Sequence, residues 1–398
     1  MKKSRLSNPR IAVQVEKNRA HGRALLEGIS DYAHEHTDWR LELVDSDRLQ
    51  STADVRSFDG LIVRVMDDVT EDVLIRSRRP VVDTYGRVDE NSLPSIRLDD
   101  TAIAEMAFKS LSEHHYRTFA YCGFPGVRFS EARGAAFRAC AEKAASDVFL
   151  YSGRTGVTDR FFRDEKTDVP DAEALSDWLN SLPKPIALFC CNDLRAVQVL
   201  CVCADCGIRV PQDVSLLGVD NDVLLCTFAN PSLSSVMTDP FALGRRAAAM
   251  LDVQMGSPRR HGEGTPVAMQ FFKPKRVIER MSTDAYPFKT PWLADAVRYI
   301  RRNLANGVTA NDVVAFIGYS QPTVNKAFGE ELGHSIKKEI MLQRGSLACA
   351  MLRETKRSVG EIAELCGYQR AQYFVFSFAK EFGQTPDAWR RLNGFLKT

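Results

Sequence analysis

The sequence predicts a two-lobed α/β body followed by an all-α C-terminal domain with two helix-turn-helix units. Three observations predict this architecture. Over the first ~280 residues, short apolar runs alternate with segments of helical periodicity, which is the pattern of strand–helix crossover units. A stretch rich in turn-forming residues then interrupts the pattern. After it every segment has helical periodicity, and two of the turns between helices carry the same Gly-Tyr pair.

The body is expected to contain parallel sheets with helices on both faces, because parallel strands need long crossover connections. The predicted strands are Arg10–Gln14, Leu41–Val44, Leu61–Val65, Pro80–Val82, Ile96–Asp100, Thr118–Cys122, Val148–Tyr151, Ala187–Cys191 and Ser215–Val219. The predicted helices are Leu25–Ala33, Ile103–Ser112, Ala132–Ala144, Ala172–Leu182 and Leu194–Cys206. An aspartate in the pair Asp99-Asp100 is expected to cap the helix that follows it. There are more strands than one doubly wound sheet needs, which favours two lobes.

The C-terminal domain is expected to be entirely helical. Its first helix places Trp292, Ala296 and Ile300 on one face. The later predicted helices are Ala310–Ile317, Gln321–Leu332, Ile336–Arg353, Val359–Cys366, Ala371–Phe382 and Pro386–Asn393. In each helix-turn-helix unit glycine makes the turn, since it takes the positive φ that ends a helix at little cost. Ser320 is expected to cap the second helix of the first unit.

The domain boundaries follow from these patterns. We expect a body at residues 8–280, a linker at 281–291 and a C-terminal domain at 292–398. Hydrophobic residues make up 44% and charged residues 26%, which is typical of a soluble globular protein. Without a signal peptide or an apolar run long enough for a membrane span, we expect a cytoplasmic protein that does not enter a membrane. Its 10 cysteines are then expected to be reduced thiols.

Charge is distributed unevenly along the chain. Residues 289–398 carry 16 Lys and Arg against 10 Asp and Glu, a net charge of +6, whereas the rest carries 37 against 41. A mildly acidic body joined to a basic tail is typical of a sensor attached to a nucleic-acid-binding domain. Chance variation over a solvated surface would produce the same imbalance, so charge alone leaves both interpretations open.

The second helix-turn-helix unit carries the most distinctive run of the tail, Ser358–Tyr368, continued by Gln372–Phe374 and Phe378–Pro386. These residues resemble the AraC/XylS family of transcription regulators, and the resemblance covers about 100 residues. It implies that the second helix of each unit lies in the major groove of double-stranded DNA, with Ile336–Arg353 as the connector between the units. By position it assigns DNA contacts to Gln321, Pro322, Asn325, Lys326, Arg370, Ala371, Gln372 and Tyr373. Phe376 stands where the family often has a basic residue, and we expect it to pack against other side chains.

Two carboxylates of the body come directly after predicted strands. Asp193 follows Ala187–Cys191, and Asp220 follows Ser215–Val219. Side chains at the carboxyl ends of parallel strands face the crevice where open α/β sheets bind ligands. A carboxylate accepts hydrogen bonds from a diol, and an arginine donates to sugar oxygens, so this pairing suits a polyol.

These segments, together with Asn230–Val236 and Leu243–Ala248, resemble the LacI/GalR-type effector domain of the periplasmic-binding-protein fold over residues 9–280. That family has its helix-turn-helix at the N-terminus, whereas here the DNA-binding part follows the sensor. A LacI-like sensor followed by an AraC-type tail is the arrangement of XylR-type xylose-operon regulators. The resemblance assigns effector binding to Arg23, Arg133, Asp193, Arg195, Asp220 and Asn221. A helix-capping role for Asp193, and a surface position for Arg23 and Arg133, remain open.

The resemblance implies a sugar-responsive transcription regulator, an activator of pentose (D-xylose) utilisation genes. Its implied partners are double-stranded DNA, a small sugar, RNA polymerase and a second copy of the chain, with no cofactor. A repressor, or a sensor of another sugar, would have the same architecture. A sugar-processing enzyme with a DNA-binding tail is the alternative of a different class, although the sequence has no phosphate-binding loop or nucleophile elbow.

A metal site is not expected at Cys201, Cys203 and Cys206. On a helix Cys201 points away from the other two, and no second cysteine or histidine pair lies nearby in the sequence. We therefore expect thiols without a metal.

Overall fold

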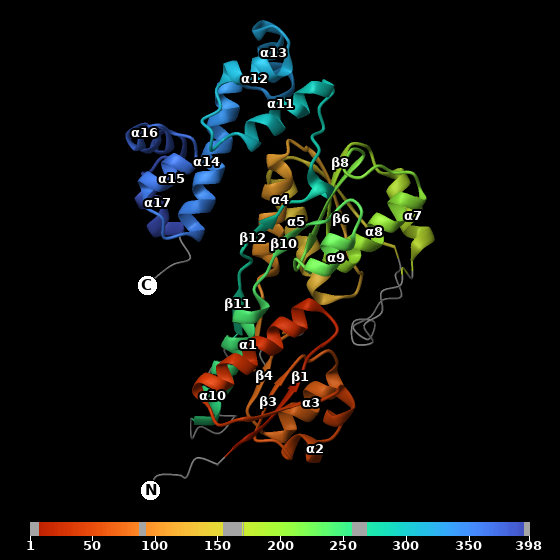
Figure 1. Cartoon of the computed structure of the whole chain (residues 1–398). Coiled ribbons are helices and arrows are strands. Elements are labelled where there is room, and N and C mark those ends of the chain that lie inside the picture. The colour runs from red at the N-terminus through yellow and green to blue at the C-terminus, as the bar shows by residue number, and fades with distance from the viewer. Residues whose placement is uncertain (1–7, 87–92, 154–168, 170, 257–268, 394–398) are drawn as a thin grey trace. The chain divides into compact units, whose positions relative to one another are not determined.

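The computed structural model describes residues 8–86, 93–153, 169, 171–256 and 269–393 (Figure 1). The chain divides into two compact units, residues 1–285 and 286–398. The first contains two parallel α/β lobes and the second is all-helical, so the predicted fold class is confirmed. Residues 281–285, which the sequence assigned to the linker, pack with the first unit. No helix of the described chain combines the length and apolarity that crossing a membrane requires.

Lobe 1 is built on a six-stranded sheet in the order β11-β5-β4-β3-β1-β2, in which every pair is parallel. Its strands are β1 (Arg10–Gln14), β2 (Arg40–Leu43), β3 (Gly60–Val63), β4 (Val81–Asp83), β5 (Ser95–Leu98) and β11 (Met269–Phe272). Its helices are α1 (Ala20–His36), α2 (Thr52–Arg56), α3 (Asp68–Ser77) and α10 (Pro240–Gly256), with a 3₁₀ turn at Ser46–Leu49. One hydrophobic core joins the sheet to α1 and α10, and a second joins its other face to α2 and α3.

Lobe 2 has a second six-stranded sheet in the order β12-β10-β9-β8-β6-β7, parallel except for the β10–β12 pair. Its strands are β6 (Thr118–Cys122), β7 (Asp147–Leu150), β8 (Ile186–Cys190), β9 (Val214–Val219), β10 (Ser234–Met237) and β12 (Arg276–Ile278). Its helices are α4 (Asp100–Glu113), α5 (Arg128–Lys143), α7 (Ala172–Ser181), α8 (Asp193–Asp205) and α9 (Val223–Phe228), with a 3₁₀ turn at Met281–Thr283. Alternate strand residues face the two cores of this lobe.

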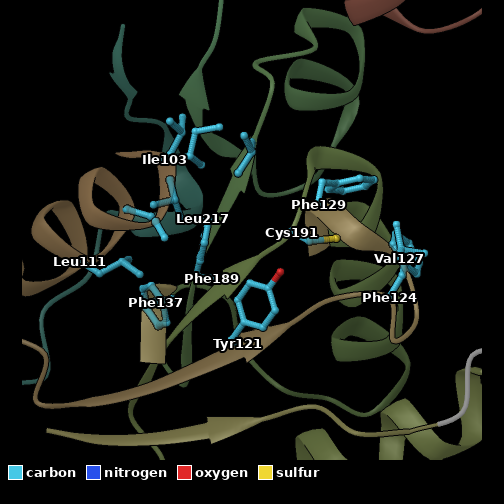
Figure 2. Close-up of a cluster of buried hydrophobic side chains, with 14 of the residues drawn as sticks. Ile103, Leu111, Tyr121, Phe124, Val127, Phe129, Phe137, Phe189, Cys191 and Leu217 are labelled. Carbon is cyan, nitrogen blue, oxygen red and sulfur yellow. The ribbon is translucent and has the colours of Figure 1, made fainter. Parts of the chain in front are cut away.

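Aromatic side chains fill the core of lobe 2 between its sheet and the helices α4 and α5 (Figure 2). The ring centroid of Phe137 lies 5.1 Å from that of Phe189 and 6.3 Å from that of Tyr121. The Tyr121 hydroxyl donates a hydrogen bond to the Ser130 carbonyl oxygen at 2.5 Å. This packing fixes the first turn of α5 against the sheet, and that turn contributes to the functional site.

The chain crosses between the lobes three times, after β5, after β10 and after β11. Each lobe therefore contains segments from distant parts of the sequence (Figure 1). Each predicted strand and helix corresponds to an observed one, although the predicted helix Gln321–Leu332 is α-helical only to Ala327. The sequence pattern did not delimit α2, α3, α9, α10, β10, β11 and β12, and it did not assign α10 and β11 to lobe 1. Short elements carry little periodicity, and lobe membership is a tertiary property.

The C-terminal unit consists of seven α-helices within its described residues. They are α11 (Pro291–Arg302), α12 (Ala310–Ile317), α13 (Gln321–Ala327), α14 (Ile336–Glu354), α15 (Val359–Leu365), α16 (Ala371–Phe382) and α17 (Pro386–Asn393), with a π-helical turn at Phe328–Leu332. One core surrounds α11 to α13 and another surrounds α15 to α17, and α14 contributes to both. Figure 1 shows α14 as the helix common to the two groups.

The two helix-turn-helix units share their local devices. Gly318 and Gly367 in the two turns both have φ of +76°, as the sequence predicts. The Ser320 side chain accepts from the Thr323 amide and caps α13, which confirms that prediction. The first helix of each unit begins with a reciprocal capping box, from Thr309 in α12 and from Ser358 in α15.

Lobe 1 depends on a close crossing of α1 and α10. A Cβ on Gly28 would lie 2.0 Å from the Phe241 carbonyl oxygen, and one on Gly244 would lie 2.2 Å from the Leu25 carbonyl oxygen. Each contact is with backbone, so the helices must separate to admit a side chain. The two glycines therefore set the distance between the helices.

We predict that Gly28→Ala and Gly244→Ala each destabilise the first unit by about 1–3 kcal/mol, through overpacking. Gly256→Ala is the control, because the same helix ends there with nothing within 4 Å of the added Cβ. Urea unfolding followed by circular dichroism measures the difference. Equal stability of all three variants would contradict the role given to the crossing.

Candidate functional site

A cavity of about 450 Å³ lies between lobe 1 and lobe 2, at the carboxyl ends of strands from both sheets. Lobe 1 contributes the residues that follow β1, β3 and β4, and lobe 2 contributes those after β8 and β9 and the first turn of α5. The charged lining residues are Lys17, Arg19, Arg64, Arg97, Arg128, Arg133, Glu16, Asp45, Asp100, Asp193, Asp220 and Asp222. A lining so rich in charge suits a polar ligand that forms many hydrogen bonds.

Asp220 projects from a backbone turn at the end of β9. Asp220 and Asn221 have φ of 104° and 52°, a region that few residues other than glycine adopt. The Asp220 amide donates to the Val236 carbonyl oxygen at 3.0 Å, and the Asn221 amide donates to Ser235 Oγ at 2.9 Å. Within the described chain no hydrogen bond occupies the Asp220 carboxylate, which lines the cavity. This carboxylate is therefore available to a ligand.

Asp193 lines the same cavity, but its carboxylate oxygens accept hydrogen bonds from other groups of the protein. It is 1% exposed, and it accepts hydrogen bonds from Ser235 Oγ at 2.6 Å and from the Asp222 amide at 2.8 Å. Burial, together with the charge of Asp220, raises the pKa of Asp193 well above its ordinary value. The cap of α8 is Asn192, whose side chain accepts from the Arg195 amide. Asp193 instead holds the turn that presents Asp220.

Arg133 reaches the cavity from α5 and shares a carboxylate with Arg128. Arg133 Nε donates to Asp100 Oδ1 at 2.9 Å, and Arg128 Nη1 lies 3.2 Å from Asp100 Oδ2. Arg133 Nη1 also donates to the Cys191 carbonyl oxygen. Burial lowers the pKa of Arg133, but the charges of Asp100 and Asp220 outweigh it and the net shift is upward. Arg133 is therefore a fixed cation, only 3% exposed, at the cavity wall.

On the lobe 1 side the cavity is bounded by Glu16, Arg64 and His21. Arg64 donates a hydrogen bond to Glu16, and its guanidinium carbon lies 4.8 Å from the ring centroid of Tyr85. Burial lowers the pKa of His21, although the charges of Asp220 and Glu16 oppose this shift. A neutral imidazole offers one donor and one acceptor to a ligand hydroxyl.

Three of the predicted effector residues do not line the cavity. Arg195 is fully buried in lobe 2, where its Nη2 donates to Asp171 Oδ2 at 2.7 Å. Arg23 is exposed and donates to the Asn18 carbonyl oxygen at 2.6 Å. The Asn221 side chain accepts from Arg280 Nη2 at 2.7 Å. The cavity thus brings together Arg133, Asp193 and Asp220 from the predicted set.

No three His, Cys, Asp or Glu side chains are grouped to hold a metal ion in the part of the chain that the structure describes. Cys201 is exposed whereas Cys203 is buried, and Cys206 Sγ lies 3.1 Å from Ser176 Oγ.

A second candidate site is the outer surface of the two helix-turn-helix units. In α13 the side chains of Val324 and Ala327 are buried, and the predicted DNA contacts Gln321, Pro322, Asn325 and Lys326 are exposed. In α16 Phe374 and Phe378 are buried, and the predicted contacts Arg370, Ala371, Gln372 and Tyr373 are exposed. Both second helices therefore present their predicted contact residues to solvent.

Comparison with known proteins places both units. Residues 108–283 match the family described as a periplasmic binding protein-like domain, and residues 313–392 match a helix-turn-helix domain. The xylose operon regulatory protein of Escherichia coli (strain K12) is 28% identical over 394 residues, 96% of this chain and 97% of that protein. This chain is therefore similar to the xylose operon regulatory proteins over almost its whole length. The protein of that name in Haemophilus influenzae is also 28% identical, over 391 residues, 96% of this chain and 98% of its own.

A solved relative of the xylose operon regulators supports the same relationship. The structure described as the xylose-binding transcription activator xylR is 28% identical, with a TM-score of 0.60, over 98% of this chain and 99% of that one. The cellobiose complex of the regulator CelR has a TM-score of 0.55 at 19% identity over 70% of this chain, which shows the fold of the sensor alone.

Several charged residues that line the cavity were not predicted from the sequence. Asp100 was interpreted with Asp99 as a helix cap, whereas Asp99 caps α4 and Asp100 faces Arg128 and Arg133. Arg64 directly follows β3 and Arg97 lies within β5, but the predicted strands Leu61–Val65 and Ile96–Asp100 enclose both residues. The strand-end rule that selected the two aspartates therefore did not select these arginines.

The prediction for Phe376 was wrong. Its side chain is 71% exposed, and Tyr373 on the same helix is 65% exposed. The core of this unit uses Phe374 and Phe378, four residues apart on the opposite face of α16. Phe376 lies two positions from each of them and so points outward.

The buried ion pair of Arg195 leads to a stability prediction. Asp171→Ala leaves a buried guanidinium without its carboxylate and should destabilise the first unit by about 3–5 kcal/mol. Asp72→Ala, which breaks an exposed pair with Arg76, is the control and should cost no more than about 0.5 kcal/mol. Chemical denaturation of both variants makes the comparison. Similar losses in the two would show that the Arg195 pair contributes little.

The same pair sets a direction of pH dependence. Burial alone would raise the pKa of Asp171, but the hydrogen bonds from Arg195 and Tyr151 bring it below its ordinary value. The stabilisation is therefore present above the ordinary aspartate pKa and is lost as pH falls through the lowered one.

Proposed function

We propose that this protein is a sugar-responsive transcription regulator that binds a pentose-sized sugar, such as D-xylose, between its lobes and double-stranded DNA through its C-terminal unit. One observation carries the proposal. The Asp220 carboxylate, which accepts no hydrogen bond from the described residues, and the fixed guanidinium of Arg133 line one cavity. The same chain also carries two helix-turn-helix units. The end-to-end similarity to xylose operon regulatory proteins supports it.

The proposed effector contacts divide by role. Asp220 accepts hydrogen bonds from sugar hydroxyls, and Arg133 donates to sugar oxygens. Asp193 and Asn221 act on the same turn, through Ser235 and Arg280 respectively. Arg195 supports the start of α8 from within the core, and Arg23 holds the loop before α1 through Asn18. These last four act by positioning the groups that contact the ligand.

Ligand binding would be transmitted by closure of the lobes. The cavity takes residues from both lobes, and the three chain crossings between them are the natural hinges. A ligand that contacts both lobes binds the closed form more tightly and so shifts the population toward it.

On the DNA side, the exposed residues of α13 and α16 would contact two stretches of major groove. Asn325 and Gln372 have amide groups suited to paired hydrogen bonds with adenine. Lys326 Nζ lies 3.7 Å from Glu330 Oε1, and both side chains are exposed. A DNA phosphate could readily replace Glu330 as the partner of Lys326, because such exposed ion pairs are weak. The basic tail favours non-specific attraction to the phosphate backbone.

The proposal includes a homodimer and recruitment of RNA polymerase, with activation as the output. Exposed apolar side chains on α9, Val223, Leu224 and Phe228, are 60%, 69% and 88% exposed. Such a group is typical of an interaction surface. Asp222 immediately precedes α9, and its amide donates a hydrogen bond to the Asp193 carboxylate. This bond links α9 to the cavity. The relative described as a transcription activator supports the activating role.

An enzyme that processes a sugar is the alternative of a different class, and repression or another sugar are alternatives within the regulator class. Purified protein that converts a sugar would support the enzyme. A DNA band shift that changes when sugar is added would support the regulator.

We predict that Asp220→Asn weakens sugar binding by about 10- to 150-fold, the effect of losing a charged hydrogen-bond partner worth about 1.5–3 kcal/mol. Asparagine tolerates positive φ, so the turn and the basal DNA affinity should persist. Asp177→Asn, at an exposed position on α7, is the control. Calorimetric titration with D-xylose gives the affinities. Unchanged affinity of the Asp220→Asn variant for D-xylose would show that Asp220 does not contact the sugar.

For DNA, Asn325→Ala and Gln372→Ala should each cost about 1–3 kcal/mol on a cognate site and much less on random DNA. Fluorescence anisotropy with both duplexes, at one fixed salt concentration, separates the two effects. If a variant loses affinity equally for both duplexes, the residue contacts the backbone rather than a base.

A further inference from the structure

We propose that the cavity binds the acid form of a pentose-sized sugar, a polyhydroxy monocarboxylate, more tightly than the neutral sugar. The proposal rests on the function proposed above, because it takes the cavity as the effector site and names the class of effector. Its basis is the juxtaposition of Arg128 and Arg133 around the single carboxylate of Asp100, with Asp220 elsewhere on the cavity wall.

The donors around Asp100 exceed the acceptors. Asp100 uses one oxygen for Arg133 Nε, at 2.9 Å, and the other for its ion pair with Arg128. None of the N–H groups of Arg128 forms a hydrogen bond within the described chain, and its Nε is buried. Arg133 Nη2 likewise has no hydrogen bond among the described residues. Buried donors are nearly always paired, and Arg128 Nε is buried without a partner among the described residues, so this end of the cavity is suited to an acceptor that a ligand supplies.

The electrostatic surroundings favour a charged acceptor over a neutral one. Burial lowers the pKa of Arg128, and the nearby charges of Arg97 and Arg133 lower it further, although Asp100 opposes them. The Arg97 guanidinium is held in place by a hydrogen bond from its Nη1 to the Gly86 carbonyl oxygen at 2.6 Å. A carboxylate placed against Arg128 would relieve this repulsion and accept a forked pair of hydrogen bonds.

Two further features of α5 agree with an anion at this place. Arg128 is the first residue of the helix, whose N-cap Val127 has no side-chain hydrogen bond to cap it, and helix N-termini attract anions. The acidic residue of the first turn, Glu131, accepts from the Gly126 amide and is exposed. Glu131 therefore does not occupy the position offered to the ligand.

Asp220 limits the ligand to one negative charge. Its carboxylate has no hydrogen bond among the described residues and would accept from hydroxyl groups, but it would repel a second anionic group. A ligand with a carboxylate at one end and hydroxyl groups along the rest matches the two parts of the cavity. An aldonate such as D-xylonate has this arrangement.

Calorimetric titration of the full chain with sodium D-xylonate and with D-xylose tests the proposal. D-xylonate should bind at least about 10-fold more tightly. Arg128→Gln should weaken D-xylonate by about 10- to 100-fold, the usual effect of losing a charged hydrogen bond, and change D-xylose less than about 3-fold. Arg128→Lys keeps the charge without the fork and should restore part of the loss. Arg138→Gln, exposed on the same helix, is the matched control and should change neither affinity.

Circular dichroism confirms that each variant folds before it is titrated. Equal affinity of the unmodified protein for the two ligands, or an equal loss of both in Arg128→Gln, would overturn the preference for an acid. Tighter binding of D-xylose 5-phosphate than of D-xylonate would contradict the inference that the ligand carries a single negative charge. Binding of D-xylose alone overturns this proposal and leaves the proposed function standing, whereas binding of neither ligand, with no effect on DNA affinity, overturns both.

Discussion

The cavity between the lobes depends on how the buried carboxyl group of Asp193 joins three segments of lobe 2. From the first turn of α8 it accepts hydrogen bonds from Ser235 in β10 and from the amide of Asp222 before α9. Asp220 and Asn221, in the turn that connects β9 to α9, both have positive φ, and this conformation directs Asp220 into the cavity. Gly218 in β9 permits the close approach, because a Cβ there would lie 2.3 Å from Asp193 Oδ1. Without this network the backbone would relax and the Asp220 carboxylate would lose its orientation toward the cavity.

Much of the architecture could be predicted from the sequence, because it depends on local physical signals. The apolar runs of β8 and β9, which are buried throughout, located the two strand ends that precede Asp193 and Asp220. The repeated Gly-Tyr turns and the apolar pairs of the second helices located both helix-turn-helix units, and the observed φ values of Gly318 and Gly367 agree. These signals span a few residues each, so a single sequence contains them in full.

The remaining part of the site depends on tertiary geometry. The family resemblance assigned Arg195 to the effector site together with Asp193. Residues two apart on a helix point to opposite sides, however, and the partner of Arg195 is Asp171, which lies in a distant segment. The pairing of Arg128 and Arg133 with Asp100 joins α5 to the start of α4, which no local pattern indicates. Phe376 follows the same logic, since only the packing of α16 decides which of its aromatic residues is exposed.

The interleaved lobes also impose an order on synthesis. Lobe 1 takes its last helix and strand from α10 and β11, so its sheet lacks an edge strand until residue 272 has been made. Most of lobe 2, from α4 to β10, is continuous in sequence and is complete by residue 237. As the chain leaves the ribosome, this part of the second lobe can therefore fold before the first lobe is finished, and the edge strand β12 joins it afterwards. The α1 face that α10 later covers stays exposed in the meantime. The helix-turn-helix unit, residues 286–398, is synthesised after both lobes.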